Sequence, residues 1–246
     1  MSWQKKYNLL IFDEIDSTSC EAVRMAKTCP DGSYVILAKN QTKSRGRNSK
    51  IWHSSLGNLH VSILLNHKIN LSYIPQLSFV MAIVVYKTIN SLSVRSENSI
   101  KLKWPNDVLI NDKKVSGILL ESISINDNNY LIIGVGINVK GSPLNIDQLA
   151  TNLSDENIEV KDLEYLLELL MINFEKYFSR WKQEGFSKIR QYWLKRAYKL
   201  GKMVTVNDGN TKISGIFKDI DENGSIRIQL ASGQDYCVNY ATEIIY

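Results

Sequence analysis

The sequence is poor in the residues that cross-link small secreted proteins, because its 246 residues include only three cysteines. Cys20, Cys29 and Cys237 are odd in number and form no CxxC pair, so we expect neither a disulfide framework nor a zinc cage. The chain also lacks a continuous apolar run of about 18 residues, which argues against a membrane-spanning helix. Near the N-terminus only Leu9–Phe12 is apolar, so we expect no signal peptide. These absences favour a cytoplasmic protein without a membrane partner.

Histidine is equally scarce, and its pattern does not indicate a metal site. His53, His60 and His67 are spaced by seven, which would place them on one side of a helix. Gly57 and the β-rich residues after it argue against that helix, so we expect no protein-built metal site.

The overall composition is that of an ordinary globular protein, with 44% hydrophobic and 22% charged residues. The net charge of +5 suits an anionic ligand or partner but does not require nucleic acid. The length allows one large domain, or a large and a small one.

Hydrophobic periodicity predicts a mixed α+β domain followed by a small β unit. A capping box from Thr18 to Glu21 should begin the first helix. Helices are expected at about 19–28, 75–94, 162–181 and 187–198. Strands are expected at 9–17, 33–40, 59–66, 100–104, 107–112, 115–122 and 128–139. After Gly201 the pattern changes to four short strands joined by polar turns, so we predict one domain over 1–199 and an SH3-like β barrel over 200–246.

The segment 39–52 carries five basic residues and no acid. A solvated basic face is one explanation, and a loop that binds a small anion is another. Two features favour the loop. The segment joins two predicted strands, and Gly46 stands between Arg45 and Arg47, whose guanidinium groups can bind carboxylate or phosphate oxygens bidentately.

A second basic segment, 103–121, combines a polar turn with a glycine. Asn106 and Asp107 follow a proline at a turn, and Lys114 lies three residues before Gly117. A plain β-hairpin with exposed lysines would also fit this pattern.

Two further glycines, Gly134 and Gly136, lie within a predicted strand. Val139 stands where a dinucleotide-binding motif would need its third glycine, so a Rossmann fold is not expected. Glycines within a strand more often mark a place where another group packs against the backbone.

Taken in order, these segments resemble the biotin protein ligase family. The matching motifs are DSTS at 16–19, Gln41 through Arg47 with Trp52, KWPND at 103–107, KVSGILLE at 114–121 and GVGIN at 134–138. The resemblance implies a mixed, largely antiparallel sheet with packed helices, of the class II synthetase and biotin ligase type, and a C-terminal SH3-like barrel.

The resemblance also implies an ATP-dependent ligase. It would join biotin to ATP, forming biotinyl-5′-AMP and pyrophosphate with Mg²⁺ present. It would then pass biotin to a lysine of a biotin carboxyl carrier domain of acetyl-CoA carboxylase or a related carboxylase. A homodimer is a further expectation, and a nucleic-acid partner is not expected.

Individual roles follow from the same resemblance. Lys114, Arg47 and Asp107 are the expected catalytic residues, with Asp107 orienting the attacking amine or holding Mg²⁺. The residues expected to bind biotin are Ser17, Thr18, Ser19, Gln41, Arg45, Gly46, Arg47, Lys114, Gly117, Gly134 and Gly136. The residues expected to bind the nucleotide are Arg45, Arg47, Lys50, Asn106, Asn138 and Trp193, the last by stacking on adenine.

The chain departs from the family pattern mainly in the basic loop. Ser44 and Ser49 stand where the family has glycines, and Lys50 where it has arginine. Lysine cannot reproduce the planar fork of arginine, so we expect altered loop energetics. At the biotin end, Ser19 stands where asparagine is common.

Two alternatives remain open, and one related role is not expected. A lipoate or octanoate ligase on the related fold is the first alternative, although the polar residues at 17–19 favour biotin. A nucleic-acid-binding protein is the second, but residues 39–51 contain no interleaved aromatic side chains. A repressor role is not expected, because fifteen residues before the first motif cannot hold a helix-turn-helix.

Overall fold

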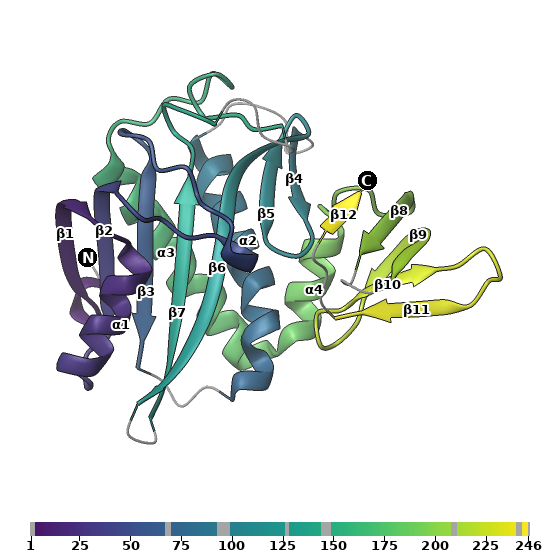
Figure 1. The fold of residues 1–246 in the computed structure, drawn as a ribbon, viewed down its shortest axis with the longest axis horizontal. Helices are drawn as coiled ribbons and strands as arrows, with labels where there is room; N and C mark the ends of the chain where they lie inside the picture. Colours follow the sequence, from purple (N-terminus) through teal and green to yellow (C-terminus); the bar gives the residue numbers. More distant parts are fainter. Residues whose placement is uncertain are drawn as a thin grey trace.

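The computed structural model describes residues 3–66, 70–92, 99–125, 128–143, 149–207, 211–239 and 243–245, which form two β-sheets and four α-helices (Figure 1). The larger sheet has seven strands in the order β1-β2-β3-β7-β6-β5-β4, of which only β1 and β2 pair in parallel. Its strands are β1 Asn8–Ile15, β2 Tyr34–Gln41, β3 Leu59–Leu65, β4 Ile100–Lys103, β5 Asp107–Ile110, β6 Lys113–Ile125 and β7 Asn128–Ile137. The helices are α1 Thr18–Thr28, α2 Ile74–Leu92, α3 Leu163–Glu184 and α4 Phe186–Leu194, and short 3-10 turns cover Trp3–Lys5, Arg47–Ser49 and Leu71–Tyr73.

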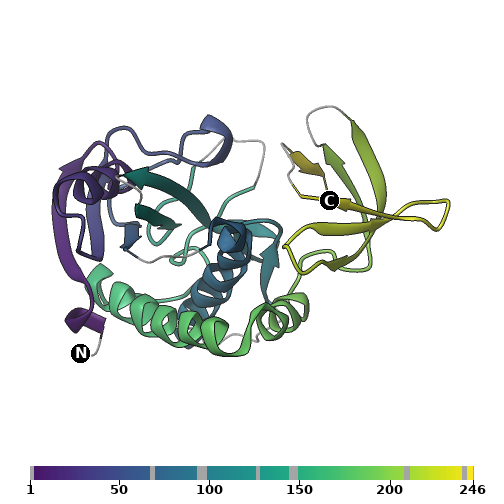
Figure 2. The same ribbon diagram turned by 90° about the horizontal axis from the view of Figure 1, so that it is seen from below.

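The two faces of the large sheet differ in how they are covered. On β7, Leu131, Ile133 and Val135 belong to the main hydrophobic core with α2 and α3, whereas Tyr130 and Ile132 belong to a smaller core beneath α1. Figure 2 shows α2 and α3 on one side of the sheet and the loop after β2 on the other. Because α1 covers only part of its face, the rest of that face is available for a site.

The helices follow from their sequences. Helix α2 is apolar on most sides because it lies between the sheet and α3. Helix α3 is capped at its start by Asp162, whose carboxylate accepts a hydrogen bond of 2.7 Å from the backbone amide of Tyr165. It is capped at its end by Gly185, which has a φ of 75°. The fourth helix is shorter than expected and ends at Leu194.

The predicted capping box is wrong. Ser17 is the N-cap residue and Thr18 is already helical, without a side-chain cap. The hydroxyl of Thr18 instead bonds to Gln41 of β2 and Ser62 of β3, because the start of α1 lies over these strands.

The C-terminal unit is a five-stranded antiparallel sheet of the SH3-like type, in the order β11-β10-β9-β8-β12. Its strands are β8 Met203–Asn207, β9 Lys212–Ile220, β10 Ile226–Gln229, β11 Asp235–Val238 and β12 Glu243–Ile245, the last of which was not predicted. Most of the predicted turn at 207–210 falls outside the described residues. The α+β fold class is confirmed, while the boundary at residue 199 stays a prediction.

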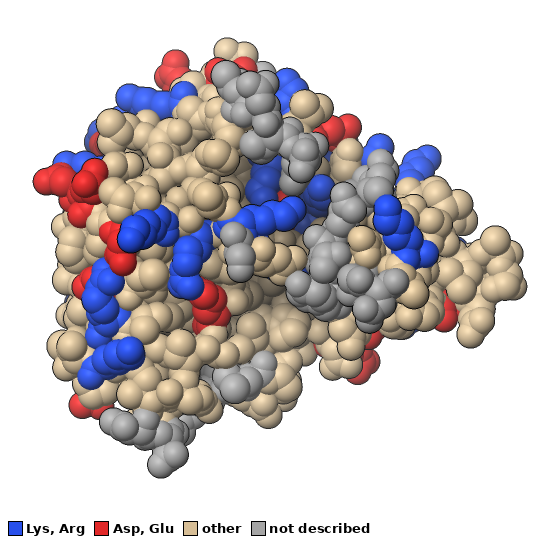
Figure 3. Space-filling view, in the orientation of Figure 1, with Lys and Arg blue, Asp and Glu red and all other residues tan. Residues whose placement is uncertain are grey.

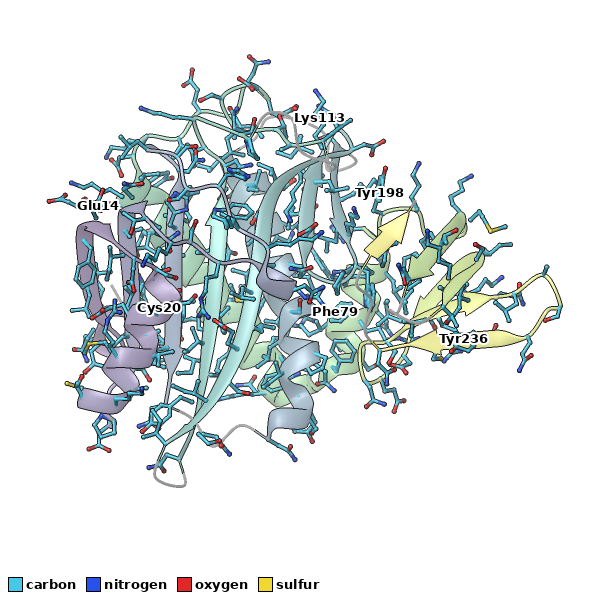
Figure 4. All side chains as sticks on the ribbon, viewed as in Figure 1. Glu14, Cys20, Phe79, Lys113, Tyr198 and Tyr236 are labelled. Atoms are coloured by element: carbon cyan, nitrogen blue, oxygen red, sulfur yellow. The ribbon has the colours of Figure 1, made fainter. Side chains whose placement is uncertain are left out.

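The turn between β9 and β10 packs the small unit against the large one. The indole of Trp104 donates a hydrogen bond of 2.9 Å to the carbonyl of Gly224. Gly224 has a φ of 87°, and a Cβ at this position would lie 2.9 Å from the ring of Phe79 on α2, which is labelled in Figure 4. Arg190 of α4 also forms an ion pair with Asp219 of β9. Among the described residues, no helix is both long and apolar enough to cross a membrane.

Candidate active site

A single cross-strand row defines the floor of the candidate site. His60 on β3 pairs with Gly136 on β7, and Gly136 pairs with Gly117 on β6. Gly117 pairs with Asp107 on β5, and Asp107 pairs with Lys103 on β4. Residues directly opposite each other on neighbouring strands face the same side of a sheet. Two glycines, a carboxylate, an ammonium group and an imidazole therefore share one face.

A β-bulge brings Lys114 onto this face. The β5–β6 register shifts so that Val108 pairs with Ser116 and Leu109 with Lys114. The extra residue turns Lys114 to the same side as Gly117, whereas a regular strand would point residues three apart to opposite sides. The Lys114 Nζ lies 2.6 Å from Asp107 Oδ1, and both side chains are largely shielded from solvent. The pair therefore combines a fixed cation with a fixed carboxylate beside bare backbone.

The basic segment after β2 is an ordered loop over this face. Its two ends pair at Arg45 and Ile51, and the amide of Gly46 donates a hydrogen bond of 2.7 Å to the carbonyl of Lys50. A Cβ on Gly46 would lie 3.2 Å from that carbonyl oxygen, so the glycine permits the tight turn of the loop itself.

Both loop arginines reach the sheet. Arg45 forms a 2.8 Å ion pair with Glu121 of β6, and Arg47 donates a 3.2 Å hydrogen bond to the side-chain oxygen of Asn106. Asn106 in turn donates a 2.6 Å bond to the carbonyl of Ile118. A cavity of about 760 Å³ lies between the loop and β6, lined by Lys43, Arg45, Arg47 and Lys50, with Glu121 as its acid. Figure 3 shows the Lys and Arg side chains that gather around this hollow.

A group of hydroxyls lies at the other end of the floor, where α1 begins. The Thr18 amide and hydroxyl donate bonds of 2.9 and 3.3 Å to Gln41 Oε1. The hydroxyls of Thr18 and Ser19 lie 2.8 and 3.1 Å from Ser62 Oγ. A Cβ on Gly134 would lie 3.1 Å from Ser19 Oγ. The predicted residues Thr18, Ser19, Gln41 and Gly134 are therefore neighbours.

Between the two ends, the indole of Trp52 lies on the glycine floor. A Cβ on Gly117 would lie 2.9 Å from the Trp52 ring, and a Cβ on Gly136 only 2.4 Å from it. The Lys114 Nζ lies 5.7 Å from the centre of the same ring. A side chain of the loop therefore lies directly over the backbone of these two glycines.

The comparisons with known proteins agree with this arrangement. Residues 12–138 match the model of the biotin/lipoate A/B protein ligase family, and residues 199–246 match the biotin protein ligase C-terminal domain. A biotin–[acetyl-CoA-carboxylase] ligase of Paracoccus denitrificans is 33% identical over 225 residues, which cover 89% of this chain and 93% of that protein.

The chain belongs to the biotin protein ligase family. A Bacillus spizizenii bifunctional ligase/repressor BirA is also 33% identical, covering 92% of this chain and 70% of that protein. The structure of a biotin protein ligase from Aquifex aeolicus in complex with biotin and ATP aligns with a TM-score of 0.82 and 29% identity, covering 97% of this chain and 98% of that one. Family membership confirms the expected enzyme class, a biotin–[acetyl-CoA-carboxylase] ligase.

Sequence reasoning missed several residues of this ligase site. Lys103 and Glu121 stand at the ends of the motifs KWPND and KVSGILLE, but no role was predicted for either residue. His60 and Ser62 join the site through strand pairing, which only the register reveals. Burial lowers the pKa of Lys103, and the positive charges of Lys114 and Lys50 lower it further, against the opposing effect of Asp107. The lowered pKa of Lys103 thus reflects mainly its burial, and also the other lysines that lie near it.

For three other predicted site residues, Ser17, Asn138 and Lys50, the structure gives no side-chain contact with another predicted site residue among the residues it describes. Ser17 is buried, and its amide donates a 2.7 Å bond to Asp16. Asn138 follows Gly136 by two residues, and its side-chain amide donates a 3.0 Å hydrogen bond to the backbone carbonyl of Thr151. Lys50 is exposed, Ser49's side chain is not described, and His67 lies outside the described residues.

The prediction that Trp193 stacks on adenine is wrong. Its side chain is 1% exposed and packs edge-on against Phe79, with ring centres 5.0 Å apart. The helical periodicity of α4 places Trp193 in the core, so neither ring face is open to a ligand.

We therefore expect Trp193→Phe to leave ATP affinity unchanged within twofold, while lowering thermal stability because the smaller ring leaves a cavity. Isothermal titration with ATP and thermal unfolding measure the two effects. A large loss of ATP affinity in a well-folded variant would restore the stacking assignment.

Proposed function

We propose that this protein activates the carboxylate of biotin with ATP as biotinyl-5′-AMP and then transfers the biotinyl group to a lysine of a biotin carboxyl carrier domain. The observation that carries the proposal is the Lys114–Asp107 pair, 2.6 Å apart, beside the glycine floor and under a loop with two inward-reaching arginines. Family membership supports biotin as the substrate.

The cations serve the first step. A carboxylate and a triphosphate repel each other, so their approach requires fixed positive charge. Lys114 on the bulge supplies charge from the floor, and Arg47 supplies it from the loop above the same face. Lys103, one strand beyond Asp107, adds a third ammonium group that can receive the departing pyrophosphate. Because these groups are held before substrates arrive, little reorganisation is needed during reaction.

The loop covers the adenylate intermediate and shields it from water. A mixed anhydride hydrolyses in water, so its retention requires a cover. Arg45 and Arg47 each reach a residue of the sheet side, Glu121 and Asn106, which holds the loop across the floor. Both bonds lie on exposed or partly exposed groups and can exchange for contacts with an anionic ligand.

Asp107 serves the second step. The incoming lysine amine must lose a proton as it attacks the activated carbonyl. A carboxylate fixed by Lys114 can accept a hydrogen bond from that amine and orient its lone pair. Carrier domains of acetyl-CoA carboxylase are the expected acceptors, as the name of the Paracoccus relative implies for that enzyme.

Mg²⁺ would arrive with the nucleotide. Mg²⁺ is commonly bound by one or two carboxylates together with substrate phosphates and water. Asp107 offers one carboxylate, and within the residues that the structure describes no cluster of three or more His, Cys, Asp or Glu side chains could hold a metal alone. When bound, the ion would neutralise phosphate charge, and Lys114, Arg47 and Lys103 would share that role.

The homodimer and the cytoplasmic location stay predictions. The large sheet ends at β1, which pairs only with β2 among the described strands, so a second copy could extend the sheet there.

The test is a streptavidin blot of a purified biotin carboxyl carrier domain incubated with this protein, biotin, ATP and Mg²⁺. The expected result is a signal that requires ATP. If the protein binds lipoate in preference to biotin in calorimetry and no blot signal appears, the biotin assignment is wrong and the lipoate alternative stands.

Arg47→Ala should shorten the lifetime of the bound adenylate by on the order of tenfold or more, because the loop loses one contact with the sheet and one cation. The lifetime is measured by monitoring the release of adenylate from the preformed complex with rapid filtration. Thermal stability should change by less than about 0.5 kcal/mol, since an exposed loop contributes little to the core. Lys39→Ala, which removes an exposed cation outside the cavity lining, is the control and should release the adenylate at the wild-type rate.

A further inference from the structure

Three buried polar atoms gather around Gly136 and have no hydrogen-bond partner among the described residues: Trp52 Nε1, His60 Nδ1 and Asn138 Oδ1. His60 lies directly opposite Gly136 on the neighbouring strand. Trp52 Nε1 would lie 2.8 Å from a Cβ on Gly136, and Asn138 is two residues after Gly136, immediately past the end of β7. Buried polar groups are nearly always paired, so such a cluster indicates a group that binds there.

His60 has the clearest chemistry of the three. Its side chain is 1% exposed, and its Nε2 lies 3.4 Å from the carbonyl oxygen of Ser55. A carbonyl only accepts, so Nε2 carries the proton and Nδ1 keeps its lone pair. Burial lowers the pKa of His60, which keeps the ring neutral near pH 7. Nδ1 is therefore a buried acceptor without a donor among the described residues, on a side chain that shares the sheet face of Gly136.

We propose that His60 is a further substrate-binding and specificity-determining residue, whose Nδ1 accepts a hydrogen bond from an N–H group of the ligand ring that binds over Gly136. This inference rests on the proposed biotin ligase function.

The ureido ring of biotin matches this acceptor. A cyclic urea offers one carbonyl and two N–H donors, so its site needs acceptors as well as hydroxyl donors. The hydroxyl cluster surrounds Ser62, which is two residues from His60 on the same face of β3. Gln41 Oε1 already accepts two bonds from Thr18, whereas His60 Nδ1 accepts none from the described residues and lies on the same strand as Ser62.

The same acceptor explains discrimination against a lipoyl chain. A dithiolane ring has no N–H group and would leave Nδ1 buried and unpaired. Sites built to hydrogen-bond a substrate reject an analogue that lacks the donor. His60 thus favours a ureido ring over an apolar ring of similar size.

Binding over Gly136 also requires the Trp52 indole to move, since it now fills that space. The Trp52 backbone is held at its carbonyl by the hydroxyl of Ser44, so the side chain can rotate while the base of the loop stays closed. The displaced ring can then lie against the ligand.

The test compares biotin binding by calorimetry in the full-length wild type, His60→Phe and His60→Gln. Phe keeps the ring but removes the acceptor, and should weaken biotin binding by on the order of tenfold while leaving lipoate binding unchanged. Gln has an acceptor oxygen and should restore most of the affinity. His53→Phe, at an exposed position near the same loop, is the matched control and should bind as wild type.

A second measurement needs no variant of His60. The Nδ1 resonance of His60 in ¹⁵N-labelled wild type should shift on addition of biotin toward that of a hydrogen-bonded acceptor. Equal biotin affinity in His60→Phe and wild type, or a His60 resonance that ignores bound biotin, would overturn the inference alone. Wild-type protein that binds no biotin would instead overturn the proposed function.

Discussion

Lys114→Ala should lower the rate of adenylate formation by on the order of a hundredfold to a thousandfold, which is the effect of removing one preorganised charge from a reacting centre. Lys114 is held by the bulge in β6 with its Nζ 2.6 Å from Asp107. Its loss removes a cation and also leaves the Asp107 carboxylate uncompensated beside two anionic substrates. Both effects raise the barrier.

The measurement is single-turnover release of pyrophosphate from enzyme saturated with biotin and ATP. Lys113→Ala is the matched control, because Lys113 is an exposed lysine at the adjacent position of the same hairpin (Figure 4). It should react at the wild-type rate. A Lys114→Ala enzyme that forms adenylate within threefold of the wild-type rate, with unchanged circular dichroism, would remove Lys114 from the chemistry.

The local pattern of the sequence was enough to predict most elements. Alternation and apolar runs give every strand of the large sheet within a few residues, and the all-round apolar character of 75–94 correctly indicates a buried helix. These features depend on neighbours in the sequence. The predicted capping box was wrong for the opposite reason, because the Thr18 hydroxyl bonds to residues of β2 and β3 that are distant in the sequence.

The site was predictable only in part, because it too depends on contacts between residues that are distant in the sequence. Lys114 and Asp107 could be named from their motifs, but their 2.6 Å pairing depends on a bulge that no local pattern marks. Lys103 and His60 enter the site through strand register, which is a long-range property. The prediction that Trp193 stacks on adenine was wrong because a tryptophan in a helix core and one that stacks on a ligand have the same sequence pattern.

Gly136→Ala should weaken biotin binding by about tenfold to a hundredfold, since overpacking a tight site costs about 1–3 kcal/mol. The new Cβ would lie 2.4 Å from Trp52 Cε2, a distance that Cβ atoms do not adopt, so the indole must leave the groove. The methyl group then takes the space against which the ligand ring would lie. The substitution therefore moves the Trp52 indole away but covers the backbone of residue 136 with a methyl group, so the ligand ring gains no space there.

Gly141→Ala is the matched control, because its Cβ would meet only Ser55, at an ordinary 3.4 Å. Calorimetry with biotin should separate the two variants, and thermal unfolding should show that both fold. The sign of the effect decides what the glycine does. If Gly136→Ala bound biotin more tightly than wild type, Trp52 would be an obstacle that the methyl group removes, and the bare backbone at Gly136 would not be a contact surface for the ligand ring. A loss confined to Gly136→Ala would instead show that the floor of the site needs both a movable indole and an uncovered strand.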